Sequence, residues 1–90
     1  MNSDEFNMAV DIVKHLHKKP DNNELLKLYG LFKQSTIGDN TNSKPLFIDF
    51  KATSKHNAWM EQIGKDKYTS EVEYITLVNE LIKKYGIIEE

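Results

Sequence analysis

The stretch DNNELLKLYGLFKQSTIG, residues 21–38, decides the fold class of this chain. Its leucine and aromatic side chains recur at steps of three and four residues, which predicts the apolar face of a helix over residues 22–37. Asp21 followed by Glu24 is the pattern of a capping box at the start of this helix. Gly38 suits the position just beyond its last turn. The stretch therefore predicts a well-delimited amphipathic helix.

The chain on either side predicts three more helices. Ser3 and helical apolar spacing predict a helix over residues 4–17, which Pro20 terminates. A helix that follows Asp49 should run to about residue 63, with the weakest apolar pattern of the four: Phe50, Ala58, Trp59 and Ile63. The last helix should end near residue 85, and its start is open between caps at residues 66 and 70. Its apolar pattern has two rows: Tyr68, Val72, Ile75, Val78 and Ile82, and Tyr74, Leu77, Leu81 and Tyr85.

The segment between residues 38 and 48 is a long loop by composition, rich in Asn, Asp, Ser and Thr. Its end, Leu46-Phe47-Ile48, is apolar, so we expect it to pack against the helices. The prediction is an all-α fold with four helices. Ninety residues are enough for a single domain, residues 1–90, with a modest core.

Composition excludes several classes of protein. The chain has no cysteine, so disulfides and thiolate metal sites are impossible. Its 12 basic residues are all lysine and its net charge is −2, which argues against a nucleic-acid partner. Apolar runs are too short to span a membrane, and the polar, acidic start does not resemble a signal peptide. We expect a cytoplasmic location.

No pattern indicates catalysis. The chain has no nucleophile elbow, no phosphate-binding loop and no glycine-rich dinucleotide loop. His15 and His17 point roughly 200° apart on a helix and cannot share a metal, and His56 has no obvious partner. Residues 39–50 lack the glycine and glutamate that a calcium-binding EF-hand loop requires. We expect no catalytic residue, no metal and no cofactor.

One helix face carries a different pattern. Tyr29, Phe32, Lys33 and Thr36 share a face in the stretch 22–37, and Lys55 repeats the pairing with Trp59. An aromatic ring one turn from an ammonium group suits an anionic aromatic ligand such as an adenine nucleotide. On spacing alone, core aromatics and solvated lysines explain the same pattern, so both interpretations stay open.

These residues belong to motifs that resemble the acyl-CoA-binding protein family. Lys33-Gln34-x-Thr36-x-Gly38-Asp39 is similar to the family pattern YxxYKQATxGD. The similarity continues through Pro45, Asp49-Phe50-Lys51, Lys55-x-x-Ala58-Trp59, Tyr74-Ile75 and Leu81-x-x-Lys84-Tyr85-Gly86-Ile87. It covers residues 6 to 87, nearly the whole chain.

The resemblance implies an up-down-down-up four-helix bundle whose long loop joins two parallel middle helices. It also implies non-catalytic binding, transport and buffering of medium- to long-chain fatty acyl-CoA esters. In that site Tyr29 would stack on adenine, and Lys33 and Lys55 would contact the ribose 3′-phosphate region. Tyr74 would close this pocket, and Lys14 would supply a cation at its edge.

The resemblance further implies that Leu25, Leu26 and Ser54 line the acyl groove. It assigns Phe6, Tyr74, Ile75, Val78 and Leu81 to a packing seam between the first and last helices. The protein would be a monomer without stable membrane insertion, with at most transient contact with membranes or acyl-CoA-using enzymes.

Three positions depart from the family pattern: Phe32 replaces a second tyrosine, His56 replaces a tryptophan, and Leu46 replaces a glycine. The lost hydroxyl at position 32 would weaken a phosphate contact, and His56 could make binding pH-dependent. The alternative function is a helical protein–protein adaptor of the same fold with a diverged ligand site. Retention of Tyr29, Lys33 and Lys55 argues against it.

Overall fold

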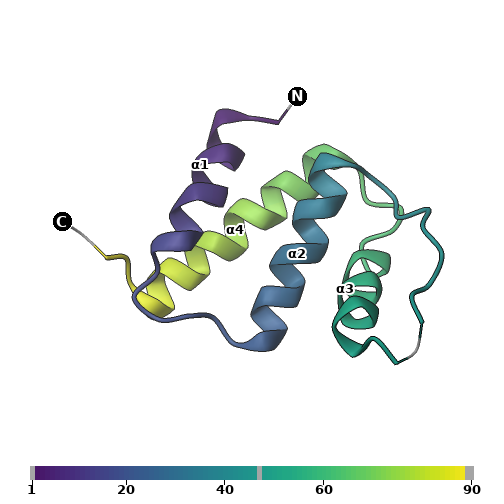
Figure 1. The fold of residues 1–90 in the computed structure, drawn as a ribbon. Coiled ribbons are helices and arrows are strands. Elements are labelled where there is room, and N and C mark those ends of the chain that lie inside the picture. Colours follow the sequence, from purple (N-terminus) through teal and green to yellow (C-terminus); the bar gives the residue numbers. More distant parts are fainter. Residues whose placement is uncertain (1, 47, 89–90) are drawn as a thin grey trace.

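The computed structural model describes residues 2–46 and 48–88 of the chain. Its helices are α1 (Asp4–Ile12), α2 (Asn22–Thr36), α3 (Phe50–Met60) and α4 (Lys67–Tyr85), with a short 3-10 turn, η1 (Val13–His15), after α1. α1 and α4 run in one direction, and α2 and α3 run in the other (Figure 1). This arrangement confirms the all-α, up-down-down-up prediction, with the long loop between the parallel helices α2 and α3.

The helix starts follow from side-chain caps. Asp21 accepts a hydrogen bond from the Glu24 N–H, and Glu24 accepts one from the Asp21 N–H, so the predicted capping box is present. Asp66, rather than Ser70, caps α4 by accepting from the Thr69 N–H. Ser70 instead donates its hydroxyl to the Asp66 carbonyl, inside the first turns of the helix.

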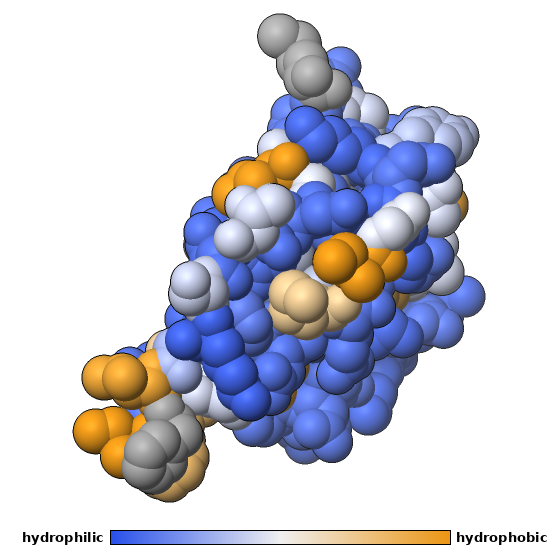
Figure 2. Space-filling view, turned by 90° about the vertical axis from the view of Figure 1, so that its right-hand side faces the viewer, coloured by the Kyte–Doolittle hydropathy of each residue, from blue (hydrophilic) through white to orange (hydrophobic). Residues whose placement is uncertain are grey.

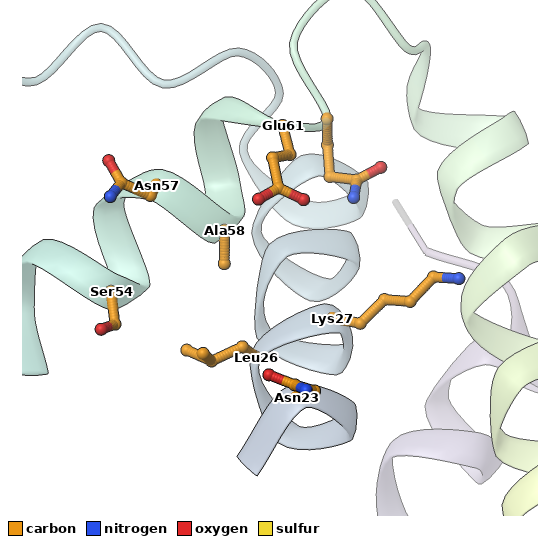
Figure 3. A pocket seen from close by; sticks show the side chains of 8 residues that line it. Asn23, Leu26, Lys27, Ser54, Asn57, Ala58 and Glu61 are labelled. Carbon is orange, nitrogen blue, oxygen red and sulfur yellow. The ribbon is translucent and has the colours of Figure 1, made fainter.

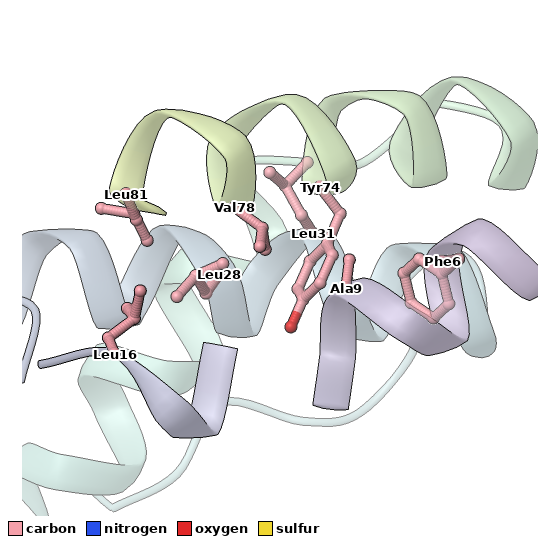
Figure 4. Packing of buried hydrophobic residues seen from close by; sticks show 8 residues of the cluster. All are labelled: Phe6, Ala9, Leu16, Leu28, Leu31, Tyr74, Val78 and Leu81. Atoms are coloured by element: carbon pink, nitrogen blue, oxygen red, sulfur yellow. The ribbon is translucent and has the colours of Figure 1, made fainter. Parts of the chain in front are cut away.

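The buried core lies among α1, α2 and α4 (Figure 4). Its apolar members come from these helices and from the segment after η1: Phe6, Ala9, Leu16, Leu28, Leu31, Tyr74, Val78 and Leu81. Ile75 packs against this cluster from α4. The predicted packing seam between the first and last helices is therefore part of the core.

Both ends of α1 are tied to the α4 side of the molecule. At its start, Asn2 and Ser3 donate side-chain hydrogen bonds of 2.8 and 2.7 Å to the carboxylate of Glu71, which is buried. After its end, Leu16 forms an isolated antiparallel bridge with Ile87. The predicted helix over residues 4–17 is therefore too long, because the backbone after residue 15 leaves the helix to pair with the C-terminal segment.

Helix α3 packs only against α2 among the helices. Gly30 makes the contact close: a Cβ atom built on it would lie 2.3 Å from the Ala58 carbonyl oxygen. The Trp59 indole N–H donates to the Gly38 carbonyl at 2.8 Å and fastens α3 to the end of α2. Ala58 and Trp59 are the buried residues of α3, as its predicted apolar pattern indicated.

Three other predictions about buried positions are wrong. Leu46 and Ile48 are 75% and 68% exposed instead of packed, and Phe47 lies outside the described residues. α3 ends at residue 60, and Phe50 and Ile63 are exposed, because α3 buries only the narrow face that meets α2. On α4, Tyr68 and Val72 are exposed, because the helix turns the side with Tyr74 and Val78 to the core.

None of the helices in the described part of the chain is both long and apolar enough to cross a lipid bilayer.

Candidate ligand-binding site

A hollow of about 490 Å³ lies between the first halves of α2 and α3, and we call it the central hollow. Its wall combines leucine, aromatic and lysine side chains: Lys19, Asn22, Leu25, Leu26, Tyr29, Phe50, Lys51, Ser54 and Lys55. The parallel course of α2 and α3 places residues from the start of both helices on this wall. The hollow therefore offers an apolar floor beside cationic groups.

Tyr29 and Lys55 meet across the central hollow. The Lys55 ammonium nitrogen lies 5.4 Å from the centroid of the Tyr29 ring, within the range of a cation–π contact. Tyr29 is half-buried and Lys55 is exposed, so both remain accessible to a ligand. The structure thus brings together two residues, 26 positions apart in sequence, that were predicted to serve one ligand.

A second hollow of about 390 Å³ adjoins the central hollow at Lys19 and Leu25, which line both. We call it the lysine hollow because Lys14 and Lys18 also line it. A third, the loop hollow of about 270 Å³, shares Tyr29 and Lys55 with the central hollow. It is bounded by the loop after α2 and, besides Lys55, by Ala52, His56 and Trp59 of α3.

Charge is distributed unevenly over these three adjoining hollows. Among the residues that the structure describes, no aspartate or glutamate lines them, and five lysines do: Lys14, Lys18, Lys19, Lys51 and Lys55. The whole chain carries a net charge of −2. The hollows are therefore a positive region on an otherwise acidic protein, which favours an anionic ligand.

At the loop hollow, Lys33 and His56 each contact a neighbouring side chain. The Lys33 ammonium nitrogen lies 5.0 Å from the centroid of the Trp59 ring, at the edge of that hollow. His56 Nδ1 lies 3.2 Å from Asn40 Nδ2, and Asn40 Oδ1 accepts from the Asn42 N–H. Since the Asn40 amide faces His56 with its donor, the Nδ1 atom of His56 must be the acceptor.

The motif residues Gln34 and Asp39 have a structural role in this site. Asp39 Oδ1 accepts from the Gly64 N–H at 2.9 Å and from the Gln34 amide at 2.8 Å. These two hydrogen bonds lower the pKa of the Asp39 carboxyl group below its ordinary value. Gln34 also donates to the Lys65 carbonyl, so the pair holds the segment after α3 against the end of α2.

Phe32 and Tyr74 lie in the core rather than on the wall of any of these hollows. Their ring centroids are 6.4 Å apart, and the Tyr74 ring lies 5.0 Å from that of Phe6. Burial raises the pKa of Tyr74 to about 12, so its hydroxyl stays protonated. Of the six residues predicted for the site, the structure places Tyr29, Lys55 and Lys14 on the hollows and Lys33 at their edge.

Sequence reasoning missed part of the site. Lys18, Lys19 and Lys51 line the hollows, yet none of the three was predicted to bind the ligand. The lysine pair just before Pro20, in the connection that enters α2, was the available indication. The three residues expected in an acyl groove, Leu25, Leu26 and Ser54, all line the central hollow.

In residues 2–46 and 48–88, no three His, Cys, Asp or Glu side chains lie close enough to hold a metal ion. The fold and the hollows define a class: a small four-helix protein with an open surface site in which an aromatic ring, ammonium groups and leucine side chains meet.

Comparison with known proteins places the chain within this class. The family model described as acyl-CoA-binding protein matches residues 3–78, so the chain belongs to the acyl-CoA-binding protein family. It is 51% identical over 81 residues to acyl-CoA-binding protein homolog 1 of Caenorhabditis elegans, covering 90% of this chain and 94% of that protein. It is 46% identical over 86 residues to the Drosophila melanogaster homolog, covering 96% and 100%.

Solved structures agree with this assignment. The crystal structure of acyl-CoA-binding protein 2 from Oryza sativa superposes with a TM-score of 0.85 at 35% identity, covering 89% of each chain. The solution structure of the yeast protein gives a TM-score of 0.73 at 42% identity, covering 94% of this chain and 99% of that one.

Proposed function

We propose that this protein binds medium- to long-chain fatty acyl-CoA esters without transforming them, and that it buffers and transports them. Residues 1–90 act as one acyl-CoA-binding domain. The observation that carries the proposal is the meeting of Tyr29 and Lys55, 5.4 Å apart, on a hollow walled by Leu25 and Leu26. One surface thus carries a ring that can stack on an aromatic base, an ammonium group that can bind phosphate, and leucines that can contact an acyl chain.

Each predicted residue has a role in this proposal. Tyr29 stacks on the adenine ring, and Lys33 and Lys55 contact the ribose 3′-phosphate region. Lys14 supplies a cation at the margin, in the lysine hollow. Phe32 and Tyr74 close the phosphate pocket from the core side, where their rings lie 6.4 Å apart.

Binding in two parts explains how such a site could select the intact ester. Lysine ammonium groups supply compact charge to the phosphates without needing burial. The acyl chain contributes roughly 0.8 kcal/mol per buried methylene before ordering is subtracted. Because neither contribution alone gives tight binding, free coenzyme A and free fatty acid are both poor ligands.

The protein acts as a cytoplasmic monomer that has no catalytic residue, requires no cofactor and binds no nucleic acid. It makes transient contact with membranes or with acyl-CoA-using enzymes, and is not stably inserted. Support comes from Leu46, Ile48 and Phe50, which are exposed apolar side chains, and Phe50 also lines the central hollow. Figure 2 shows hydrophobic atoms gathered at the lower corner of this face of the molecule.

Calorimetric titration tests the proposal. Palmitoyl-CoA is titrated into the protein, beside free palmitate and free coenzyme A. We expect saturable heat with the ester and little with either half. A folded protein that fails to bind the ester would overturn the proposal and favour the adaptor function, and release of free coenzyme A during the titration would reveal catalysis.

The role of Lys33 has its own test. Lys33→Ala should weaken palmitoyl-CoA binding about ten- to a hundred-fold, because a charge-assisted contact to phosphate is lost. Lys83→Ala is the matched control, because it removes an exposed lysine that lies in the last turn of α4 and lines none of the hollows. Equal affinities for the two variants would remove Lys33 from the site.

A further inference from the structure

A fourth hollow, of about 520 Å³, adjoins the central hollow at Leu26 and Ser54, which line both. We call it the polar hollow. Apart from Leu26 and Ala58 its wall consists of polar and charged side chains: Asn23, Lys27, Ser54, Asn57, Glu61 and Gln62. A ligand that follows the leucine wall of the central hollow past Leu26 therefore meets a polar surface.

Two charged side chains line the polar hollow, Glu61 from the end of α3 and Lys27 from α2. In Figure 3, Glu61 lies at the end of α3 next to α2. The Lys27 side chain extends from α2 on the side opposite α3. Lys65, nearby in sequence, donates to Gln62 Oε1 and pairs with Glu73, both at 2.7 Å. Within residues 2–46 and 48–88 the Glu61 side chain forms no ion pair.

We propose that the polar hollow receives the far end of the bound acyl chain and selects that end by its polarity, through Glu61. The inference rests on the proposed acyl-CoA function and specifies its substrate class. It favours acyl chains with a hydroxyl group at the far end over plain chains of equal length, and it disfavours chains that end in a carboxylate.

The physical reason is the change of surroundings at Leu26. Each methylene that lies on the leucine wall raises affinity by up to about fourfold. A methylene beyond Leu26 gains much less, because it displaces water from a carboxylate and from amide groups without replacing their hydrogen bonds. A terminal hydroxyl restores one of these bonds by donating to Glu61, whereas a terminal carboxylate meets a like charge.

The test begins with calorimetric titration of saturated acyl-CoA esters of increasing chain length. Affinity should rise with length and then level off, where the chain end passes Leu26. Three esters slightly longer than that length are then compared, ending in a methyl, a hydroxyl or a carboxylate group. We expect the hydroxyl ester to bind about tenfold more tightly than the methyl ester, and the carboxylate ester to bind most weakly.

Variants of Glu61 identify the selecting residue. Glu61→Leu should let affinity keep rising beyond the wild-type limit and should abolish the preference for the hydroxyl ester. Glu61→Gln, which retains an acceptor, should keep that preference and lose the discrimination against the carboxylate ester. Glu80→Leu, on the exposed side of α4, is the control and should match the wild type. Circular dichroism verifies that each variant is folded.

The outcomes separate the two proposals. Absence of binding to any ester by the wild type would overturn the proposed acyl-CoA function. Normal binding with no levelling of affinity, or a length limit and an end-group preference that Glu61→Leu leaves unchanged, would overturn only the role of the polar hollow.

Discussion

The three-helix unit of α1, α2 and α4 and the attached helix α3 are held by different forces. The first surrounds a continuous apolar cluster that includes Phe6 and Leu31, and both ends of α1 are fastened to the α4 side. Within the described residues, α3 contributes no residue to that cluster and, among the helices, packs only on α2, at Gly30. Its Trp59 and His56 side chains contact the segment after α2, at Gly38 and Asn40. Because the central hollow lies between α2 and α3, one wall belongs to the stable unit and the other to the lightly held helix.

The largest expected effect is the difference in lost stability between a substitution in the three-helix unit and one in α3. Phe6→Ala should lower the free energy of unfolding by about 3–5 kcal/mol, because Phe6 is 1% exposed and lies at the centre of the aromatic cluster. Phe50→Ala should change it by less than about 0.5 kcal/mol, because Phe50 is 76% exposed. Urea denaturation measures both, and similar losses would contradict the division into two regions.

Gly30→Ala should act on the contact between the regions. The added methyl group would lie 2.3 Å from the Ala58 carbonyl oxygen, so α3 must move away from α2. Overpacking of this kind lowers stability by roughly 1–3 kcal/mol, against a gain of about 1 kcal/mol in helix propensity. We expect weaker palmitoyl-CoA binding together with altered Trp59 fluorescence.

A matched control for Gly30→Ala is Glu80→Ala, another alanine substitution within a helix but on an exposed side. It should change neither palmitoyl-CoA affinity nor Trp59 fluorescence. If Gly30→Ala instead raised stability by the full propensity gain and bound palmitoyl-CoA normally, α3 would be able to shift without consequence.

Trp59→Phe should loosen α3 without forcing it away from α2. It removes the indole donor from the Gly38 carbonyl and leaves that acceptor without its 2.8 Å partner. The expected loss is about 1–2 kcal/mol in the free energy of unfolding, with faster proteolysis in the loop 38–49. Tyr68→Phe, at a residue that is 78% exposed, is the control and should do neither.

The smallest effect is a change in acid sensitivity within the three-helix unit. Hydrogen bonds from the Tyr85 hydroxyl, the Asp21 N–H and Lys84 lower the pKa of Glu24 from 4.5 to about 2. A lowered pKa means that Glu24 stabilises the fold fully above pH 4.5 and loses this contribution as the pH falls toward 2. Glu24→Gln should therefore make the melting temperature fall less steeply between pH 4.5 and 2.

The control for acid sensitivity is Glu80→Gln, which leaves the Glu24 network intact and should retain the wild-type slope. Identical slopes for wild type and Glu24→Gln would mean that other carboxylates determine the acid transition.

Local patterns predicted most of the secondary structure, but not which ammonium group lies over which aromatic ring. The capping box at Asp21 needs only residues within four positions, so it could be predicted from sequence. Asp66 and Ser70 both fit a cap, and only the structure distinguishes them: Asp66 accepts from the Thr69 N–H, whereas Ser70 donates its hydroxyl to the Asp66 carbonyl. Helical spacing paired Tyr29 with Lys33 and Trp59 with Lys55, whereas the structure pairs Lys55 with Tyr29 and Lys33 with Trp59. That Tyr29 and Lys55 serve one ligand came from the family resemblance alone.

Features that depend on distant partners could not be predicted. Apolar character alone suggested that Leu46 and Ile48 pack against the helices. They stay exposed because their burial depends on the tertiary arrangement, in which α3 contacts its neighbours over a narrow face only. The end of α1 depends on pairing between Leu16 and Ile87. Likewise, Lys18 and Lys51 line adjoining hollows only because the linker before α2 and the start of α3 come together in space.

The fastening of α1 to α4 also has a consequence for synthesis of the chain. The residues that hold α1, namely Glu71, Gly86 and Ile87, emerge from the ribosome long after α1 itself. Until then the apolar face of α1, with Phe6 and Ala9, has no α4 to cover it. We therefore expect that α1 is translated before α2, α3 and α4 but docks only after α4 has been made, leaving an uncovered segment for chaperones to bind in the interval.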